Sequence, residues 1–437
     1  PLAPIPGSDS PLELAALLRD PPLFFLERFA RYGHVFKSRL VFPVVFLVGA
    51  EANRTMLVTR RAEFAMGRGY QKTAVDRIFS GSIMLQDGED HRRTRGILSP
   101  AVGRLAVRES AESVSAIWRD VVARLAATDH AHDVYTIAQR TTFDVAANVL
   151  TGLQLGDETE RLRPDFEALI DGIMAPTKHR IPGGVLDRAL RARERLERAL
   201  VPRVEAARAE PPRGLVGALA HHRDEDGTQL TPDEVASHLL LLFWAAYDTT
   251  ASATSWVLKT LAERPDWQDR IREEIAASVR DDVGAVEGTS ELPALDWFLW
   301  EIERLYPSPL FFPRVLTEEV TYAGYRLPAE TAVMYTPFLS HRDPATWTDP
   351  HAFVPERWDP ARGEDRAKPA LLVGFGGGPR VCLGKAFAKL QLKLLVHAFV
   401  RAHRVEPDPM CRPKVRGLPI HHPLGARVRL RAIDAAW

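Results

Sequence analysis

The sequence has 437 residues, of which 46% are hydrophobic and 26% charged, as in an ordinary globular protein. Lys+Arg and Asp+Glu both number 57, so the formal net charge of zero gives no indication of nucleic-acid binding. Two cysteines exclude a disulfide framework, so we expect a reducing compartment. The absence of an apolar run of about 18 residues predicts no membrane span. The sequence contains no recognisable linker, so we expect one domain.

The first half of the chain is predicted to be helical apart from one hairpin. Residues 34–49 are rich in β-branched and aromatic side chains and predict two strands that turn near Pro43. Helical periodicity then marks residues 104–126, 132–153 and 188–210.

A long helix is predicted over residues 231–264. Thr231 and Glu234 have the spacing of a capping box, and Pro265 ends the helix. Its middle, residues 239–246, is apolar on every face and therefore predicts a central, buried helix.

A polar notch, Asp248–Thr249, interrupts this apolar helix. Burying a carboxylate and a hydroxyl is costly unless they are paired or used chemically. Thr249 could bond back to its own helix while Asp248 meets a basic neighbour, or the pair could take part in a reaction.

The second half carries further helices, a small strand region and two loops. Strands are predicted around 319–338 and a helix over 385–401, whereas 280–293 and 359–375 lack clear structure. The fold class expected from these elements is mainly α with small β-sheets (α+β).

Residues 375–384 form the most informative segment, Phe-Gly-Gly-Gly-Pro-Arg-Val-Cys-Leu-Gly. Its glycines let the main chain approach a flat partner, and the following helix favours the thiolate of Cys382. Arg380 could hold a carboxylate of the same partner. Neither a phosphate loop nor a zinc site fits the segment, since neither a Walker pattern nor a C-x-x-C is present. A thiolate ligand on a planar, carboxylate-bearing molecule describes haem held through cysteine.

The string F-x-x-G-x-R-x-C-x-G resembles the haem-binding signature of the cytochromes P450. The resemblance implies a cytochrome P450 fold over 1–437, with haem b between the 231–264 helix and the helix after the cysteine loop. It implies Cys382 as the iron ligand. The other cofactor-binding residues implied are Arg380, Phe375, Gly376, Gly378, Gly384, His91, Arg95 and Arg314, of which His91 and Arg95 lie one turn apart behind an expected cap at Asp87.

Two further motifs resemble the family's pattern. Asp248 and Thr249 would relay protons to reduced oxygen, although Ala246 stands where glycine is usual. Glu301 and Arg304, in E-x-x-R, would join Arg357 in a structural charge network. From the residues alone, an E-x-x-R pair is usually a solvated surface pair.

The resemblance also implies partners. No flavin or iron–sulfur domain fits after Cys382, so electrons would come from a ferredoxin and its reductase. We expect an acidic ferredoxin to dock on a basic surface, although a merely solvated face is an equally good interpretation; the basic residues are Lys385, Lys389, Lys393, Arg92 and Arg93. A lipophilic substrate is expected to meet Ile83, Met84, Trp244, Ala245, Leu310, Phe311 and Phe312, although for any single one of them core packing is the better-supported interpretation.

The expected function is therefore that of a haem-thiolate monooxygenase, which inserts one atom of O2 into a terpenoid, retinoid, polyketide or fatty-acid-like molecule. The alternatives are a peroxide-driven peroxygenase and a non-catalytic haem sensor. Pro1 is not preceded by methionine, so we expect a trimmed chain, and the arginine-rich composition favours a bacterial, cytoplasmic protein of secondary metabolism that never had a membrane anchor.

Overall fold

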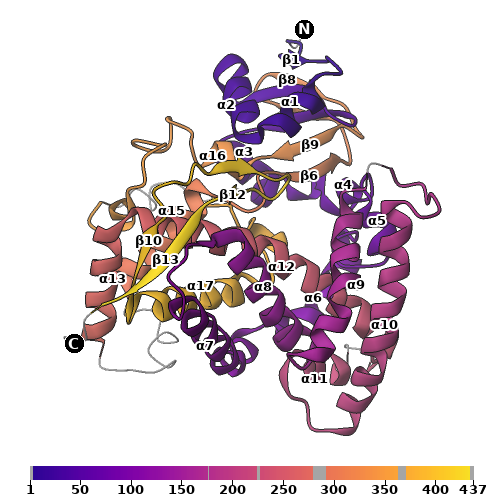
Figure 1. Cartoon of the computed structure of the whole chain (residues 1–437). Helices are drawn as coiled ribbons and strands as arrows, with labels where there is room; N and C mark the ends of the chain where they lie inside the picture. The colour runs from indigo at the N-terminus through magenta and orange to yellow at the C-terminus, as the bar shows by residue number, and fades with distance from the viewer. Residues whose placement is uncertain (1–2, 176, 224–226, 279–291, 363–370, 434–437) are drawn as a thin grey trace. The chain divides into compact units, whose positions relative to one another are not determined.

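The computed structural model describes residues 3–175, 177–223, 227–278, 292–362 and 371–433 (Figure 1). Helices dominate these ranges, and the strands are short and gather in small sheets. The predicted class, mainly α with small β-sheets, is confirmed. Within the same ranges, no helix combines the length and the apolarity needed to cross a membrane. Most of the predicted loops at 280–293 and 359–375 lie outside the described residues.

The chain divides into two compact units. The first unit comprises Pro1–Phe64, Trp118–Gln139 and Thr249–Trp437. The second comprises Ala65–Ile117 and Arg140–Asp248.

The second unit is helical. Its helical segments are α4 (Met66–Tyr70), α5 (Val75–Ile78), α6 (Gly88–Ala101), η3 (Ala146–Leu150), α9 (Asp157–Ile173), α10 (Val185–Ala209) and α11 (Gly214–His221). The long helices α9 and α10 run side by side (Figure 1). The predicted helix over 188–210 corresponds to α10.

Three helices continue from one unit into the other: α7 (Arg104–Ala126), α8 (Val134–Val145) and α12 (Pro232–Glu263). The capping box of α12 forms as the sequence predicts. Thr231 N–H donates to the carboxylate of Glu234 at 2.8 Å, and Glu234 N–H donates to Thr231 Oγ1 at 3.2 Å. These bonds satisfy backbone donors that the start of a helix otherwise leaves unpaired, so they define where α12 begins.

The strands of the first unit form several small sheets. A six-stranded sheet has the order β1-β2-β3-β9-β6-β4, in which β2 and β3 are an antiparallel hairpin and β9 runs parallel to β3. A second sheet pairs β10 with β13 and β13 with β5. The strands are β1 (Gly7–Ser8), β2 (Val35–Arg39), β3 (Pro43–Leu47), β4 (Phe64–Ala65), β5 (His132–Asp133), β6 (Phe312–Leu316), β7 (Val320–Tyr322), β8 (Tyr325–Leu327), β9 (Ala332–Tyr335), β10 (His403–Pro407), β11 (Lys414–Arg416), β12 (His422–Leu424) and β13 (Arg427–Ala432).

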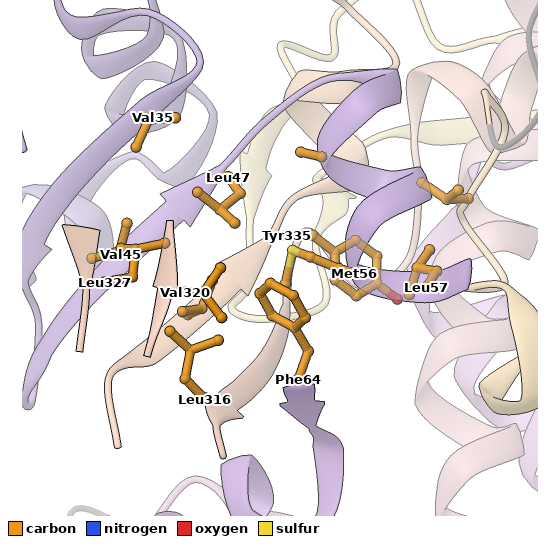
Figure 2. Packing of buried hydrophobic residues seen from close by; sticks show 13 residues of the cluster. Val35, Val45, Leu47, Met56, Leu57, Phe64, Leu316, Val320, Leu327 and Tyr335 are labelled. Atoms are coloured by element: carbon orange, nitrogen blue, oxygen red, sulfur yellow. The ribbon is translucent and has the colours of Figure 1, made fainter. Parts of the chain in front are cut away.

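One face of the six-stranded sheet is covered by an apolar cluster. Figure 2 shows Leu47 and Tyr335 on neighbouring strands facing Met56 and Leu57 of the helical turn η1 (Thr55–Thr59), with Phe64 beside them. All five side chains are at most 2% exposed. The cluster thereby fixes η1 against the sheet, and η1 in turn contacts the cysteine loop.

The remaining helices of the first unit surround these sheets. They are α1 (Glu13–Arg19), α2 (Pro21–Tyr32), α3 (Ala50–Arg54), η2 (Arg61–Glu63), α13 (Pro265–Ala277), α15 (Pro293–Leu305), α16 (Pro337–Ser340), η4 (Pro355–Trp358), η5 (Gly378–Arg380) and α17 (Lys385–Val400).

Replacing Thr231 by Ala tests the capping box. We expect the free energy of unfolding to fall by about 1 kcal/mol, because the N–H of Glu234 loses its acceptor. Urea denaturation measures the change. Thr321→Ala on β7, where the threonine is exposed, serves as the control and should have little effect. Equal urea midpoints for Thr231→Ala and the unmodified protein would show that this cap does not stabilise α12.

Candidate active site

The cysteine loop has a backbone fold that only glycine permits at one point. Gly378 has φ +58°, and a Cβ there would lie 2.1 Å from the carbonyl oxygen of Leu57. The loop closes on itself because Cys382 N–H donates to the carbonyl of Phe375 at 2.8 Å. Cys382 is exposed and precedes α17, whose N-terminal dipole favours a thiolate. The thiol is thus presented at a defined position in a loop that packs closely against Leu57.

Glu301 on α15 lies at the centre of a buried hydrogen-bond network. Its carboxylate accepts from Arg304 Nε at 2.9 Å and Nη2 at 2.8 Å, and from Arg357 Nε at 3.2 Å. It also accepts from Val354 N–H at 2.9 Å and Trp358 Nε1 at 3.1 Å. Glu301 and Arg304 are both 0% exposed, so this E-x-x-R pair is not the solvated surface pair that the spacing alone would favour.

A buried histidine connects this network to the cysteine loop. His341 Nδ1 donates to the carbonyl of Arg304 at 3.2 Å, and Nε2 accepts from Val373 N–H at 2.9 Å. Burial lowers the pKa of His341 to about 3, so the ring stays neutral and keeps this tautomer. The sequence analysis did not single out His341, because nothing in its local pattern distinguishes it from a surface histidine.

Arg314 on β6 is a buried cation beside the same loop. It is 3% exposed, and its Nη1 donates to the carbonyl of Pro313 at 2.8 Å. Its guanidinium lies 5.2 Å from the ring centroid of Tyr335, whose hydroxyl is 3.4 Å from where a Cβ would stand on Gly376. No carboxylate of the described residues forms an ion pair with Arg314. A buried guanidinium of this kind fits an anionic group of a ligand lying against the loop. Arg380, within the loop, is half-buried.

Helix α6 carries the other two cations predicted from the sequence. His91 is 6% exposed and Arg95 is half-buried, one helical turn along. Asp87 is the N-cap residue of α6, as predicted, but its side chain makes no capping hydrogen bond to that helix. Its carboxylate instead accepts from the N–H groups of Met66, Gly67 and Arg68 at 3.0–3.1 Å, at the start of α4.

Helix α12 is less uniformly buried than its sequence predicts. Leu240 and Phe243 are 0% exposed, but Ala245 is exposed, and Asp248 and Thr249 are half-buried. The opening at Ala245 places small and polar side chains of the helix where a ligand can reach them.

The predicted substrate-contact residues have different environments. Trp244 stacks on Phe79 with ring centroids 5.4 Å apart, Ile83 is buried, and Met84 is half-buried. The assignment of Leu310 is wrong. It is 0% exposed inside the apolar cluster around Phe25 and so cannot contact a substrate.

Phe311 and Phe312 are both half-buried. Phe311 contacts Phe25 at a centroid distance of 5.9 Å, and Phe312 stacks on Tyr335 at 5.0 Å. Both rings therefore belong at least partly to the packing around the sheet.

Two of the three lysines on α17 are engaged within the first unit rather than on the predicted docking surface. Lys393 is 3% exposed and pairs with Asp296 at 2.7 Å, so its assignment to a docking surface is wrong. Lys389 is half-buried over the ring of Trp300, and burial lowers its pKa. Lys385 is also half-buried. Arg92 and Arg93 on α6 are exposed, and Arg92 pairs with Glu89.

Solved structures share this fold. A structure described as retinoic acid bound cyanobacterial CYP120A1 covers 99% of this chain and 100% of its own, with a TM-score of 0.89 and 27% sequence identity. The heme domain of cytochrome P450DA has the same TM-score at 18% identity and shows the fold alone. The exposed Cys382 before α17 offers a thiolate of the kind that can ligate haem iron.

The family model for cytochrome P450 matches residues 13–421, and the chain belongs to the cytochrome P450 family. It is thus an oxidoreductase of the monooxygenase type. Three relatives are putative cytochrome P450 120 of Synechocystis sp., abscisic acid 8'-hydroxylase 3 of Oryza sativa subsp. japonica and cytochrome P450 26B1 of Mus musculus. They are 31%, 29% and 27% identical; the alignments cover 86%, 89% and 94% of this chain and 85%, 78% and 83% of theirs.

Glu301→Gln tests the buried network. The change leaves Arg304 and Arg357 without their carboxylate, and breaking a buried ion pair costs about 3–5 kcal/mol. We expect a large fall in the urea midpoint and in the yield of haem-loaded protein. Glu356→Gln is the matched control, because the side chain of Glu356 is 44% exposed and its pair with Arg270 is 3.5 Å long. Comparable midpoints for the two variants would contradict a stabilising role for Glu301.

His421→Phe tests the effect of a buried neutral imidazole on acid stability. Burial lowers the pKa of His421 from 6.5 to about 3, and neither ring nitrogen has a hydrogen-bond partner among the described residues. Between these values the unfolded chain binds a proton that the folded protein does not, so the free energy of unfolding falls as the pH falls.

The phenylalanine variant lacks this proton uptake and loses no hydrogen bond. We therefore expect its stability to decline less steeply below about pH 6.5, by up to about 1.4 kcal/mol per pH unit. Urea denaturation at a series of pH values measures the slope. Parallel curves for the variant and the unmodified protein would contradict the assignment.

Proposed function

We propose that this cytochrome P450 inserts one atom of O2 into a C–H or C=C bond of a lipophilic small molecule, with two electrons from a separate redox protein. The observation that carries the proposal is the polar pair Asp248–Thr249, which follows a buried apolar stretch of α12 and a solvent-open Ala245. A reaction that consumes protons inside an apolar site needs side chains that deliver them, because bulk water does not enter such a site freely.

The residues present fit haem b as the cofactor. The thiolate of Cys382 would ligate its iron, and the loop backbone at Gly376, Gly378 and Gly384, with Phe375, would lie against the ring. The buried guanidinium of Arg314 supports a role in holding a propionate. Arg380, His91 and Arg95 would hold the propionates with it. Bound in this way, the haem would supply the activation of O2.

Asp248 and Thr249 would control the protons. The hydroxyl of Thr249 would hold a water molecule on the open side of α12, and the carboxylate of Asp248 would pass protons to that water from solvent. Both side chains are half-buried, which lets them reach water on one side and an apolar site on the other. Ala246, where the family usually has glycine, is small enough to leave space for O2.

Two alternatives make different demands on the same residues. A peroxygenase inserts one oxygen atom of hydrogen peroxide, releases the other as water and does not need the relay, and a haem sensor needs no proton delivery at all. The presence of Asp248 and Thr249 favours the monooxygenase. Turnover with NADPH, reductase and ferredoxin, compared with turnover on peroxide alone, distinguishes the three.

The relatives support a lipophilic substrate of the terpenoid or retinoid kind. One relative is named for the 8'-hydroxylation of abscisic acid, and one structural neighbour is described with retinoic acid bound. Polyketides and fatty acids are the other candidates. A screen of these classes for a ligand-induced shift of the Soret band identifies the best probe, with retinoic acid as the first compound.

We further propose a ferredoxin as the electron donor and a bacterial, cytoplasmic setting in secondary metabolism. Of the cations predicted to dock it, Arg92 and Arg93 are exposed and Lys385 is half-buried, so these three retain that role, whereas Lys389 and Lys393 are engaged within the first unit.

Thr249→Ala tests the relay. Without the hydroxyl we expect NADPH to be consumed at a similar rate while less product and more hydrogen peroxide are formed. The measurement is product per NADPH with the probe selected by the Soret screen. Thr254→Ala on the same helix is the control, since Thr254 is 0% exposed and its hydroxyl has no partner among the described residues. Unchanged coupling in Thr249→Ala would contradict the role of Thr249.

A further inference from the structure

Lys385, Lys389 and Lys393 form a stripe of lysines along α17, and this stripe faces acidic residues of α15. Lys393 pairs with Asp296 at 2.7 Å, and Lys389 lies 5.6 Å from the ring centroid of Trp300. One turn further along α15, Glu303 interacts electrostatically with both Lys389 and Lys385. Asp296, Trp300 and Glu303 are spaced by four and three residues and so share one face of α15. The stripe is therefore an interhelical ladder of charges.

Glu303 also contacts the cysteine loop directly. A Cβ on Gly374 would lie 2.8 Å from Glu303 Cγ and 3.0 Å from Oε1, so the loop backbone presses against this side chain. The carboxylate of Glu303 accepts a hydrogen bond from the backbone N–H of Phe375. The ring of Phe375 in turn lies 5.8 Å from Nζ of Lys385.

Two hydrogen bonds made by one residue, Phe375, connect Glu303 to the ligand cysteine. Phe375 donates its N–H to Glu303 and, on the following peptide unit, accepts the N–H of Cys382 at 2.8 Å on its carbonyl. A carboxylate that orients Phe375 therefore influences the position of the carbonyl that holds Cys382. Glu301 and Arg304, its neighbours on α15, are directed into the buried network instead.

We propose that Glu303 is a positioning residue for the thiolate of Cys382, and that its charge, balanced by Lys389, sets the reduction potential of the iron bound there. The inference rests on the proposed haem-thiolate site. Hydrogen bonds to the groups that hold the iron ligand, and nearby charge, are established determinants of such potentials. Burial raises the pKa of Glu303 and lowers that of Lys389, so both side chains lie where water screens charge poorly.

The test measures the reduction potential of the haem-loaded protein in two variants, one that removes a negative charge and one that removes a positive charge. Glu303→Gln removes a negative charge and should raise the potential, because the reduced iron site carries one more negative charge. Lys389→Gln removes a positive charge and should lower it. A merely structural role would shift both variants in the same direction, since each loosens the same packing.

Glu274→Gln is the matched control. The carboxylate of Glu274 on α13 accepts backbone N–H groups of Ala294 at 2.8 Å and Leu295 at 3.1 Å, a similar contact made at the start of α15. The reduction potential of the Glu274→Gln variant should equal that of the unmodified protein.

The outcomes separate this inference from the proposed function. Potentials that move in opposite directions support it, and potentials that are unchanged, or that move in the same direction, overturn it. If Glu303→Gln does not fold, Lys389→Gln decides by the sign of its shift. An unmodified protein whose reduced carbon monoxide complex lacks the thiolate-type Soret band would instead contradict the proposed function itself.

Discussion

The buried carboxylate of Glu301 is the constraint on which the cysteine side of the first unit depends. Once this charge is removed from water, every one of its acceptor positions must be used, and two guanidinium groups, an indole and a backbone amide occupy them. Arg304 donates its other N–H groups to the carbonyls of His341, Pro350 and Ala352. Through His341 the same network reaches Val373, at the entry of the cysteine loop. The position of Cys382 is thus determined by electrostatics that lie well away from the sulfur.

Glycine supplies what the charges cannot. The loop passes so close to Leu57 and Glu303 that a methyl group at Gly378 or Gly374 would collide with a neighbour. Leu57 is itself held by the apolar cluster on the six-stranded sheet (Figure 2). Packing on one side and hydrogen bonds on the other therefore hold the loop, and the thiol is left exposed between them.

Features encoded by nearby residues could be predicted from the sequence. The 104–126 helix and the capping box at Thr231 depend on local periodicity and on a side chain that reaches its own backbone.

Features that depend on distant neighbours could not be predicted from the sequence. The spacing of Lys385, Lys389 and Lys393 predicts that they share one face of α17. It does not reveal that α15 covers this face. Asp87 has the pattern of a cap, yet its partner is α4 rather than α6. Leu310 follows a proline-rich turn but points into a core that no local pattern reveals. The strands from β10 to β13 are short, and the sequence analysis missed them.

The central claim is that the sulfur of Cys382, as a thiolate, is the protein ligand of a haem iron. The reduced protein exposed to carbon monoxide tests it most directly. The account predicts the red-shifted Soret band of thiolate-ligated haem, and its loss in Cys382→Ala but not in Cys411→Ala. A spectrum of histidine-ligated haem, or protein that binds no haem, would contradict it.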